Sequence, residues 1–176
     1  MADINDIDPR TLSTEEFARR LGSVYEDGAE RHSSDITGMD PQAFARLIKR
    51  ASKEQIDAVM SDPALRAPVL DEVFGRVAGQ FRADRAPRKD SAIHWRITGD
   101  GEPDRYETWI AGGTCSASAE PSHEPRVTLT MSGEQFLQLV SGNSSPTMMF
   151  MTGKLTLEGD IGFAANLTDL FDIPKA

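Results

Sequence analysis

This sequence contains few of the residues on which catalytic, metal-binding and nucleic-acid-binding proteins depend. Cys115 is the only cysteine among 176 residues, so no disulfide can form within the chain, and the three histidines have no partner at the spacing of metal ligands. The chain has 19 Lys and Arg against 28 Asp and Glu, and its net charge of -9 disfavours a partner rich in phosphate. We therefore expect no metal, no cofactor and no nucleic acid.

Catalytic motifs are missing as well. The segment from Gly99 to Asp104 begins like a dinucleotide-binding loop, but it lacks the third glycine and Pro103 blocks the helix that would receive a pyrophosphate. There is no Gly-x-Ser-x-Gly elbow, and Cys115 has no neighbouring cation that would activate its thiol. We do not expect an enzyme. Turnover of a thioester that is abolished by changing Cys115 or His94 would restore the interpretation of the protein as a small enzyme.

Long apolar runs are also absent. The longest uncharged stretch, residues 135–153, is broken by Ser, Asn, Gly and Pro, so we expect no stable membrane insertion. The first residues have neither the basic nor the apolar segment of a secretory leader, and the final Pro174-Lys175-Ala176 differs from a peroxisomal Ser-Lys-Leu signal. These features favour a cytoplasmic location.

The first part of the chain is predicted to be helical. Each expected helix begins with a capping residue or a first-turn proline and continues with apolar residues at helical spacing. Residues 28–38 have no period and are predicted to form a loop. The expected helix starts are Ser13, Asp40-Pro41, Ser52 with Gln55 in a capping box, Asp62-Pro63 and Ala67-Pro68.

Four strands are expected next, arranged as an antiparallel run. The first and the fourth strand alternate apolar and polar residues with the two-residue period of a strand that has one buried face. Turns at residues 99–103 and 112–113 separate the second and third strands. In the second strand Tyr106, Trp109 and Ile110 do not share one parity, so its buried face stays open. The alternating apolar residues are Ile93, Trp95 and Ile97, then Val127, Leu129 and Met131.

A fifth strand and a closing helix follow near the C-terminus. Leu155 and Leu157 alternate with polar residues, Gly159 ends the strand, and Asp160 can cap the next helix. One helix over residues 161–171 is expected to lie flat against the sheet through a single apolar stripe. That stripe consists of Phe163, Leu167, Leu170 and Phe171. The pattern as a whole is α+β, with helices on one sheet face.

Over about its last two thirds, the chain resembles the sterol carrier protein 2 family. The resemblance rests on an ordered series: the strand at 127–131, the helix ended by Gly142, the turn begun by Pro146 and the run 151–160. It implies a five-stranded, mainly antiparallel sheet with helices packed on one face around an apolar tunnel, and non-catalytic carriage of lipids. Like stand-alone bacterial members, the chain would have an N-terminal helical extension, residues 1–60, before a lipid-binding domain, residues 61–176.

Met148, Met149 and Met151 surround Phe150 on a predicted helix. Steps of about 100° per residue prevent these four side chains from all facing one core, so some of them must face something else. The residues alone favour core packing, whereas the resemblance favours a ligand cavity. On the second interpretation the tunnel lining is Trp95, Met131, Phe136, Met148, Met149, Phe150, Leu155, Phe163, Leu167, Leu170 and Phe171.

A different class of function stays open. The fold could have a filled core and act through its N-terminal helices, as a homodimer or with a partner enzyme. Bound lipid in the purified protein would favour the carrier of a lipid or another apolar small molecule. Loss of a partner on removal of residues 1–60, without any bound lipid, would favour the interaction module.

Overall fold

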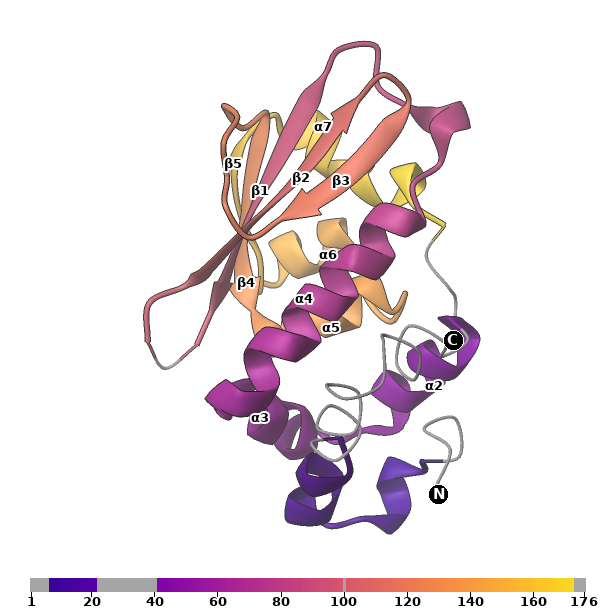
Figure 1. Ribbon diagram of the computed structural model, residues 1–176, viewed down its shortest axis with the longest axis vertical. Helices are drawn as coiled ribbons and strands as arrows, with labels where there is room; N and C mark the ends of the chain where they lie inside the picture. The colour runs from indigo at the N-terminus through magenta and orange to yellow at the C-terminus, as the bar shows by residue number, and fades with distance from the viewer. Residues whose placement is uncertain (1–6, 22–40, 100, 173–176) are drawn as a thin grey trace, which may run out of the picture.

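The computed structural model describes residues 7–21, 41–99 and 101–172, which form an α+β fold (Figure 1). Residues 14–21 are helical. The helices are η2 (Pro9–Thr11), α2 (Pro41–Arg50), α3 (Lys53–Ser61), α4 (Pro63–Gly79), η3 (Ala83–Arg85), α5 (Gly133–Val140), α6 (Pro146–Met151), α7 (Ile161–Ala165) and η4 (Leu167–Leu170). The strands are β1 (Ser91–Thr98), β2 (Asp104–Ala111), β3 (Thr114–Ser118), β4 (Val127–Ser132) and β5 (Thr156–Gly159).

The five strands form one mixed sheet in the order β3-β2-β1-β4-β5. Three of the four pairings are antiparallel, which agrees with the mainly antiparallel sheet that was expected. The prediction of a run of four antiparallel strands was wrong for β4, which pairs parallel to β1. The reason is the connection at residues 119–126, because it crosses the sheet from the β3 edge and delivers β4 to the far side of β1.

The helices α4, α5 and α6 lie on the same side of the sheet (Figure 1). Burial and register show which strand residues face them. In β2 these are Tyr106, Thr108 and Ile110, whereas Trp109 lies on the opposite face, which settles the parity that the sequence left open. The helix-facing residues of β1 and β4 alternate as expected and are Ile93, Trp95 and Ile97, and Val127, Leu129 and Met131.

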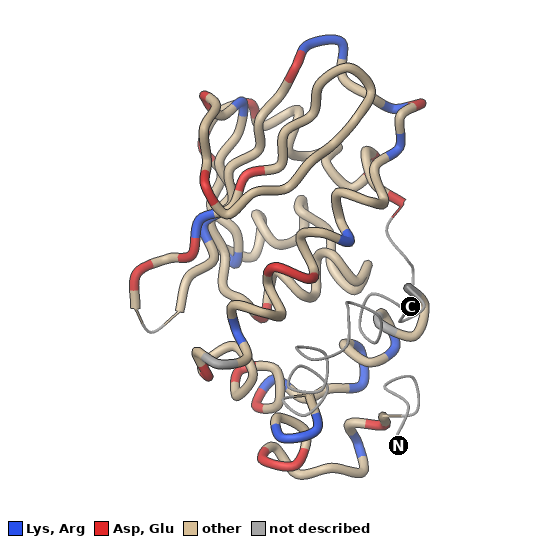
Figure 2. Tube along the Cα trace, in the orientation of Figure 1, with Lys and Arg blue, Asp and Glu red and all other residues tan. Residues whose placement is uncertain are grey.

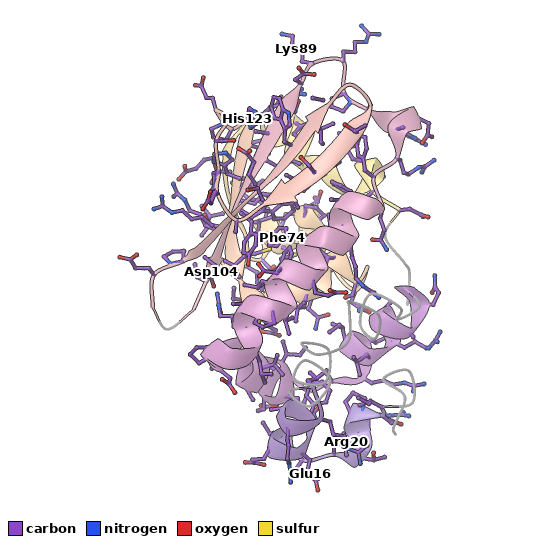
Figure 3. The ribbon with its side chains drawn as sticks, viewed as in Figure 1. Glu16, Arg20, Phe74, Lys89, Asp104 and His123 are labelled. Atoms are coloured by element: carbon purple, nitrogen blue, oxygen red, sulfur yellow. The ribbon has the colours of Figure 1, made fainter. Side chains whose placement is uncertain are left out.

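Phe74, in the middle of α4, is at the centre of the packing between helices and sheet (Figure 3). Its ring stacks on Tyr106 at 4.1 Å and on Phe136 of α5 at 4.5 Å, and it meets Trp95 edge-to-face at 5.6 Å. Trp95 and Phe136 also contact each other at 5.7 Å. Because aromatic pairs in such geometries add to the free energy gained by burial, these rings fix α4 and α5 on the sheet.

The capping signals located the helix starts well, with one exception. Ser52 and Gln55 form the expected reciprocal capping box of α3. The two starts expected at Asp62-Pro63 and Ala67-Pro68 are instead one helix, α4, with Pro68 inside it. Pro68 lacks the N–H that would bind the carbonyl four residues earlier, but burial of Leu70 and Phe74 on the following turns keeps the helix continuous.

The N-terminal helices join the same hydrophobic core as the sheet. Phe17, Leu47 and Ile56 belong to the cluster of buried side chains that also contains Phe74 and Phe136. Gln55, itself buried, donates its side-chain N–H groups to the carbonyls of Pro9 and Leu12, which ties η2 to α3. The predicted loop at 28–38 lies outside the described residues.

The closing helix expected over residues 161–171 was wrong as one element. It is divided at Asn166 into α7 and the 3₁₀ turn η4. Asn166 has φ -102° and ψ 12°, and its side-chain amide donates to the carbonyl of Gly162 at 3.0 Å, which competes with continuation of the α-helix. The stripe still packs inward at its end, because Leu167, Leu170 and Phe171 are buried.

Candidate functional site

Helix α6 is short and has defined ends. Ser145 caps it by accepting the N–H of Met148, and Pro146 occupies the first turn. At the other end Gly153 has φ +74°, and the N–H groups of Gly153 and Lys154 donate to the last turn of the helix at 3.2 and 2.8 Å. This is a Schellman motif, which ends a helix after a fixed number of residues and turns the chain sharply into β5.

Of the four large apolar side chains of α6, one faces the core and three face water. Met149 is 1% exposed, whereas Met148, Phe150 and Met151 are 58%, 47% and 75% exposed. On α7, which contacts α6, Ile161 is 54% exposed. These four exposed residues are all the exposed large apolar side chains in the part of the chain that the structure describes. We call Met148, Phe150, Met151 and Ile161 the apolar face.

Buried apolar residues lie in the segments that flank the apolar face. The backbone N–H of Leu155 donates to the carbonyl of Met149 at 3.2 Å, which brings these two buried residues together. Phe171, which directly follows η4, contacts the chain just after α4, because it forms a β-bridge and an edge-to-face ring contact with Phe81. The large buried apolar side chains in this part of the chain are Met149, Leu155, Leu167, Leu170 and Phe171, and we call them the inner group.

Asp160 and Arg126 organise the start of α7. The Asp160 carboxylate accepts the backbone N–H of Phe163 at 2.9 Å and the Arg126 guanidinium at 3.1 Å. The N–H of Phe163 and then the Arg126 side chain lower the pKa of Asp160, which confirms its expected role as a cap. Arg126 also lies 4.2 Å from the centre of the Phe163 ring, which leaves Phe163 half-buried beneath a cation.

Three groups emerge from the eleven residues predicted to line a tunnel. Trp95, Met131 and Phe136 are buried on the sheet and α5, and the two rings are packed against Phe74. Five residues form the inner group, with Phe163 half-buried against the same core. Met148 and Phe150 are exposed and stand outside that core. The structure therefore brings nine of them into one packed cluster and leaves two in contact with water.

Residues 78–172, a segment that contains the whole sheet, α5, α6 and α7, match the SCP-2 sterol transfer family. This chain belongs to the SCP-2 sterol transfer family. The apolar face and the inner group both lie within the matched segment. The α+β architecture with a five-stranded sheet agrees with the fold that the resemblance implied.

Relatives of this SCP-2 family member include longer proteins. Hydroxysteroid dehydrogenase-like protein 2 of Danio rerio is 27% identical over 116 residues, which cover 66% of this chain and 28% of that protein. The Homo sapiens protein of the same name is 27% identical over 136 residues, covering 75% of this chain and 32% of that protein. The chain thus spans about a third or less of these relatives' length.

Solved structures extend the likeness beyond the matched segment. The sec-alkylsulfatase Pisa1 from Pseudomonas sp. superposes with a TM-score of 0.50 and 13% identity, over 92% of this chain and 30% of that chain. Since 92% exceeds the share covered by residues 78–172, N-terminal helices also have counterparts in that fold. Sterol carrier protein 2-like 2 from Aedes aegypti has a TM-score of 0.45 and 20% identity, over 60% of this chain and 94% of that chain.

A polar cluster on the outer face of the sheet was missed by the sequence reasoning. Both oxygens of Glu107 are bound, by His94 Nε2 and His123 Nδ1 at 2.8 Å each, and the backbone N–H groups of Ser122 and His123 also donate to it. Burial opposes the charge of Glu107, but these hydrogen bonds outweigh it and lower its pKa to about 2. His123 stacks on Trp109 at 3.7 Å. The cluster therefore anchors the crossing connection at 119–126 (Figure 3).

The predicted hairpin between the first two strands could have indicated part of this cluster, through the pairing of residues across its turn. A turn centred within residues 99–103 places His94 opposite Glu107, the pair found in the β1–β2 register. The third member, His123, lies in a loop whose path no local pattern encodes.

Two other features separate this SCP-2 family member from an enzyme with a cysteine nucleophile. Burial raises the pKa of Cys115 to about 11, which keeps its thiol protonated at neutral pH. Cys115 pairs with Ile110 on the helix-facing side of the sheet, whereas His94 lies on the outer face. The thiol and the imidazole therefore cannot act together.

A surface hollow of about 530 Å³ lies at the start of β2. Most of its lining side chains are charged or polar, and none belongs to the predicted tunnel, so it does not match an apolar lipid site. The lining residues are Glu102, Pro103, Asp104, Arg105, Tyr106 and Ala119. Among the residues that the structure describes, no helix is long and apolar enough to cross a membrane.

Proposed function

We propose that this protein binds and carries a lipid with a fatty acyl, phospholipid or sterol-like apolar portion, and that it holds this portion against the inner group. The observation that carries the proposal is the concentration of exposed large apolar side chains on α6 and α7, beside that group. Membership of the SCP-2 sterol transfer family supports it. Met148, Phe150 and Phe163 then lie at the opening, while Trp95, Met131 and Phe136 support the site from the sheet and α5.

The physical basis of binding would be removal of apolar ligand surface from water. Each buried methylene contributes about 0.8 kcal/mol, so an acyl chain is held without an ion pair. Methionine suits such a site, because its unbranched, polarisable side chain adapts to ligands of different shape. We infer selectivity by length and shape of the apolar portion rather than by head group.

We further propose a non-catalytic role in a reducing compartment such as the cytoplasm. The single cysteine is half-buried and allows no disulfide within the chain, which fits a compartment where thiols stay reduced. The matched relatives and the sulfatase are longer proteins, of which this chain spans about a third or less.

Binding can be tested with a fluorescent fatty acid added to the delipidated full chain, together with native mass spectrometry of the protein as purified. Uptake at a stoichiometry near one and a co-purifying lipid mass are expected. A chain that neither carries a lipid nor takes up the fatty acid would refute the proposal.

A matched pair of variants locates the site. Leu155→Ala removes a leucine from the inner group, and Leu47→Ala removes a leucine from α2 that is also buried. Both create a cavity and lower stability, but only Leu155→Ala is expected to weaken fatty acid binding, by up to about tenfold for the lost contacts. Equal affinities for the two variants would place the ligand elsewhere.

A further inference from the structure

The apolar face is exposed at two adjacent helices and needs a partner other than the core. Its four residues stand on α6 and α7, which contact each other. Soluble domains rarely expose several large apolar side chains together, and such groups mark surfaces of interaction. The Schellman turn after α6 fixes the helix rigidly, so Met148, Phe150 and Met151 are held outward by the backbone rather than by chance side-chain rotation.

The charges near the apolar face differ from those of the chain as a whole. The chain has a net charge of -9, but residues 135–153 contain no charged side chain, and the trace of α6 is correspondingly uncoloured in Figure 2. Lys154, which is exposed, directly follows α6. On the α7 side, the charge of Asp160 is balanced by Arg126 at 3.1 Å. Glu158 pairs with Thr128 in the sheet, on the face opposite to the helices.

We propose that the apolar face docks on the surface of a zwitterionic phospholipid bilayer, with Met148, Phe150, Met151 and Ile161 inserted between the head groups and Lys154 at the level of the phosphates. An apolar centre with a cationic border is the composition that an interfacial protein segment requires. The docking itself stands on the surface described here. Its purpose, loading a lipid directly from the membrane, rests on the proposed function.

The size of the apolar face argues against a second copy of the chain as its partner. α6 has six residues and α7 has five, whereas a stable protein interface uses about 20–30 residues on each side. Two copies would also bring together chains that each have a net charge of -9. A neutral bilayer imposes neither requirement, and a few half-exposed side chains give the weak, reversible binding that a carrier needs.

The test uses sedimentation of the full chain with phosphatidylcholine vesicles. In the test variant Met151→Ser and Ile161→Ser are combined; both positions are exposed and neither lies at the proposed opening, so the fold should persist, and circular dichroism checks this. Thr147→Ser with Ala165→Ser is the matched control, since both residues are exposed on the same two helices. Wild type and control should pellet with vesicles, and the test variant should bind at least about tenfold more weakly.

A second measurement separates docking from lipid binding. Uptake of a fluorescent fatty acid from solution, without vesicles, should be retained by the test variant, because the inner group and the three residues at the opening are unchanged. If the wild-type chain takes up no fatty acid but its vesicle binding still depends on the apolar face, the docking proposal stands and the proposed function falls.

Three results would overturn the docking proposal. The first is wild-type protein that stays in the supernatant with phosphatidylcholine vesicles. The second is a test variant that pellets as well as the wild type. The third is wild-type protein that self-associates in solution while the test variant is a monomer, which would assign the apolar face to a second copy of the chain.

Discussion

At the scale of single residues, Glu107 shows how a charge can be buried without instability. It is the charged side chain among the buried residues that the structure describes, and four donors from His94, Ser122 and His123 surround its two oxygens. Three of these four donors belong to the connection that carries the chain from β3 to β4. Glu107 therefore supports the parallel pairing of β4 with β1, on which the register of the inner sheet face depends.

Glu107→Gln should lower stability near neutral pH and flatten its dependence on acid. The folded-state pKa of about 2 lies below the ordinary value of 4.5, so the carboxylate's contribution is fully present above pH 4.5 and is lost as the pH falls toward 2. The thermal unfolding midpoint measured from pH 7 to pH 2 should therefore separate wild type and variant most at high pH and least near pH 2. The exposed Glu158→Gln is the control, and an equal effect of both changes would contradict this role.

Gly159→Ala should be far more damaging than Gly153→Ala. Both glycines have positive φ, +104° and +74°, so both changes strain the backbone by about 1–2 kcal/mol. A Cβ on Gly153 would meet nothing within 4 Å, whereas one on Gly159 would lie 2.5 Å from the carbonyl oxygen of Arg126. The clash should cost Gly159→Ala a further 1–3 kcal/mol or so, measured as the free energy of unfolding in urea. Equal losses would mean that β5 can move away from Arg126.

At the scale of elements, the capping box of α3 offers a clean test of local sequence signals. Ser52→Ala removes the acceptor of the Gln55 N–H and should lower the free energy of unfolding by about 1 kcal/mol. Ser61→Ala, at the exposed end of the same helix, is the control and should change stability by less than about 0.5 kcal/mol in the same urea titration. A neutral Ser52→Ala would show that α3 is held by burial of Ile56 and Val59 alone.

Helix starts that are set by neighbouring capping residues were predictable from the sequence. Helix continuity and strand pairing that depend on long-range packing were not. The capping residues Ser52 and Asp160 act as the sequence indicated. Pro68 signalled a helix start, but the buried face of α4 overrode it. The parallel pairing of β4 could not be inferred, because it depends on where a polar loop crosses the sheet and not on the alternation within the strand.

The candidate site was predicted in the same partial way. The argument that the four side chains at 148–151 cannot share one core was confirmed, with Met149 inside and the other three outside. Helical geometry supplied that result without any tertiary information. That Trp95 and Phe136 pack together could not be derived locally, since both contact Phe74, a ring 21 residues from one and 62 from the other in sequence.

At the scale of the whole molecule, a strongly acidic chain combines its net charge with an uncharged apolar face on α6 and α7. Bilayers that contain anionic lipid repel a protein with a net charge of -9, and this repulsion is long-range at low ionic strength, where the screening length is about 30 Å at 0.01 M against about 8 Å at 0.15 M. Apolar insertion by Met148, Phe150, Met151 and Ile161 acts only at contact. The two contributions should therefore respond differently to salt.

Affinity for phosphatidylcholine vesicles should change little as salt is raised, whereas affinity for vesicles that also contain phosphatidylserine should start lower and rise toward the same value. Vesicle sedimentation of the full chain at low and physiological ionic strength measures both. Lys154→Gln, which removes the exposed cation beside α6, should weaken binding to the vesicles with phosphatidylserine at low salt and change binding to phosphatidylcholine vesicles much less. Affinity for phosphatidylserine vesicles that falls with salt would instead show that cations next to the apolar face outweigh the net charge of the molecule.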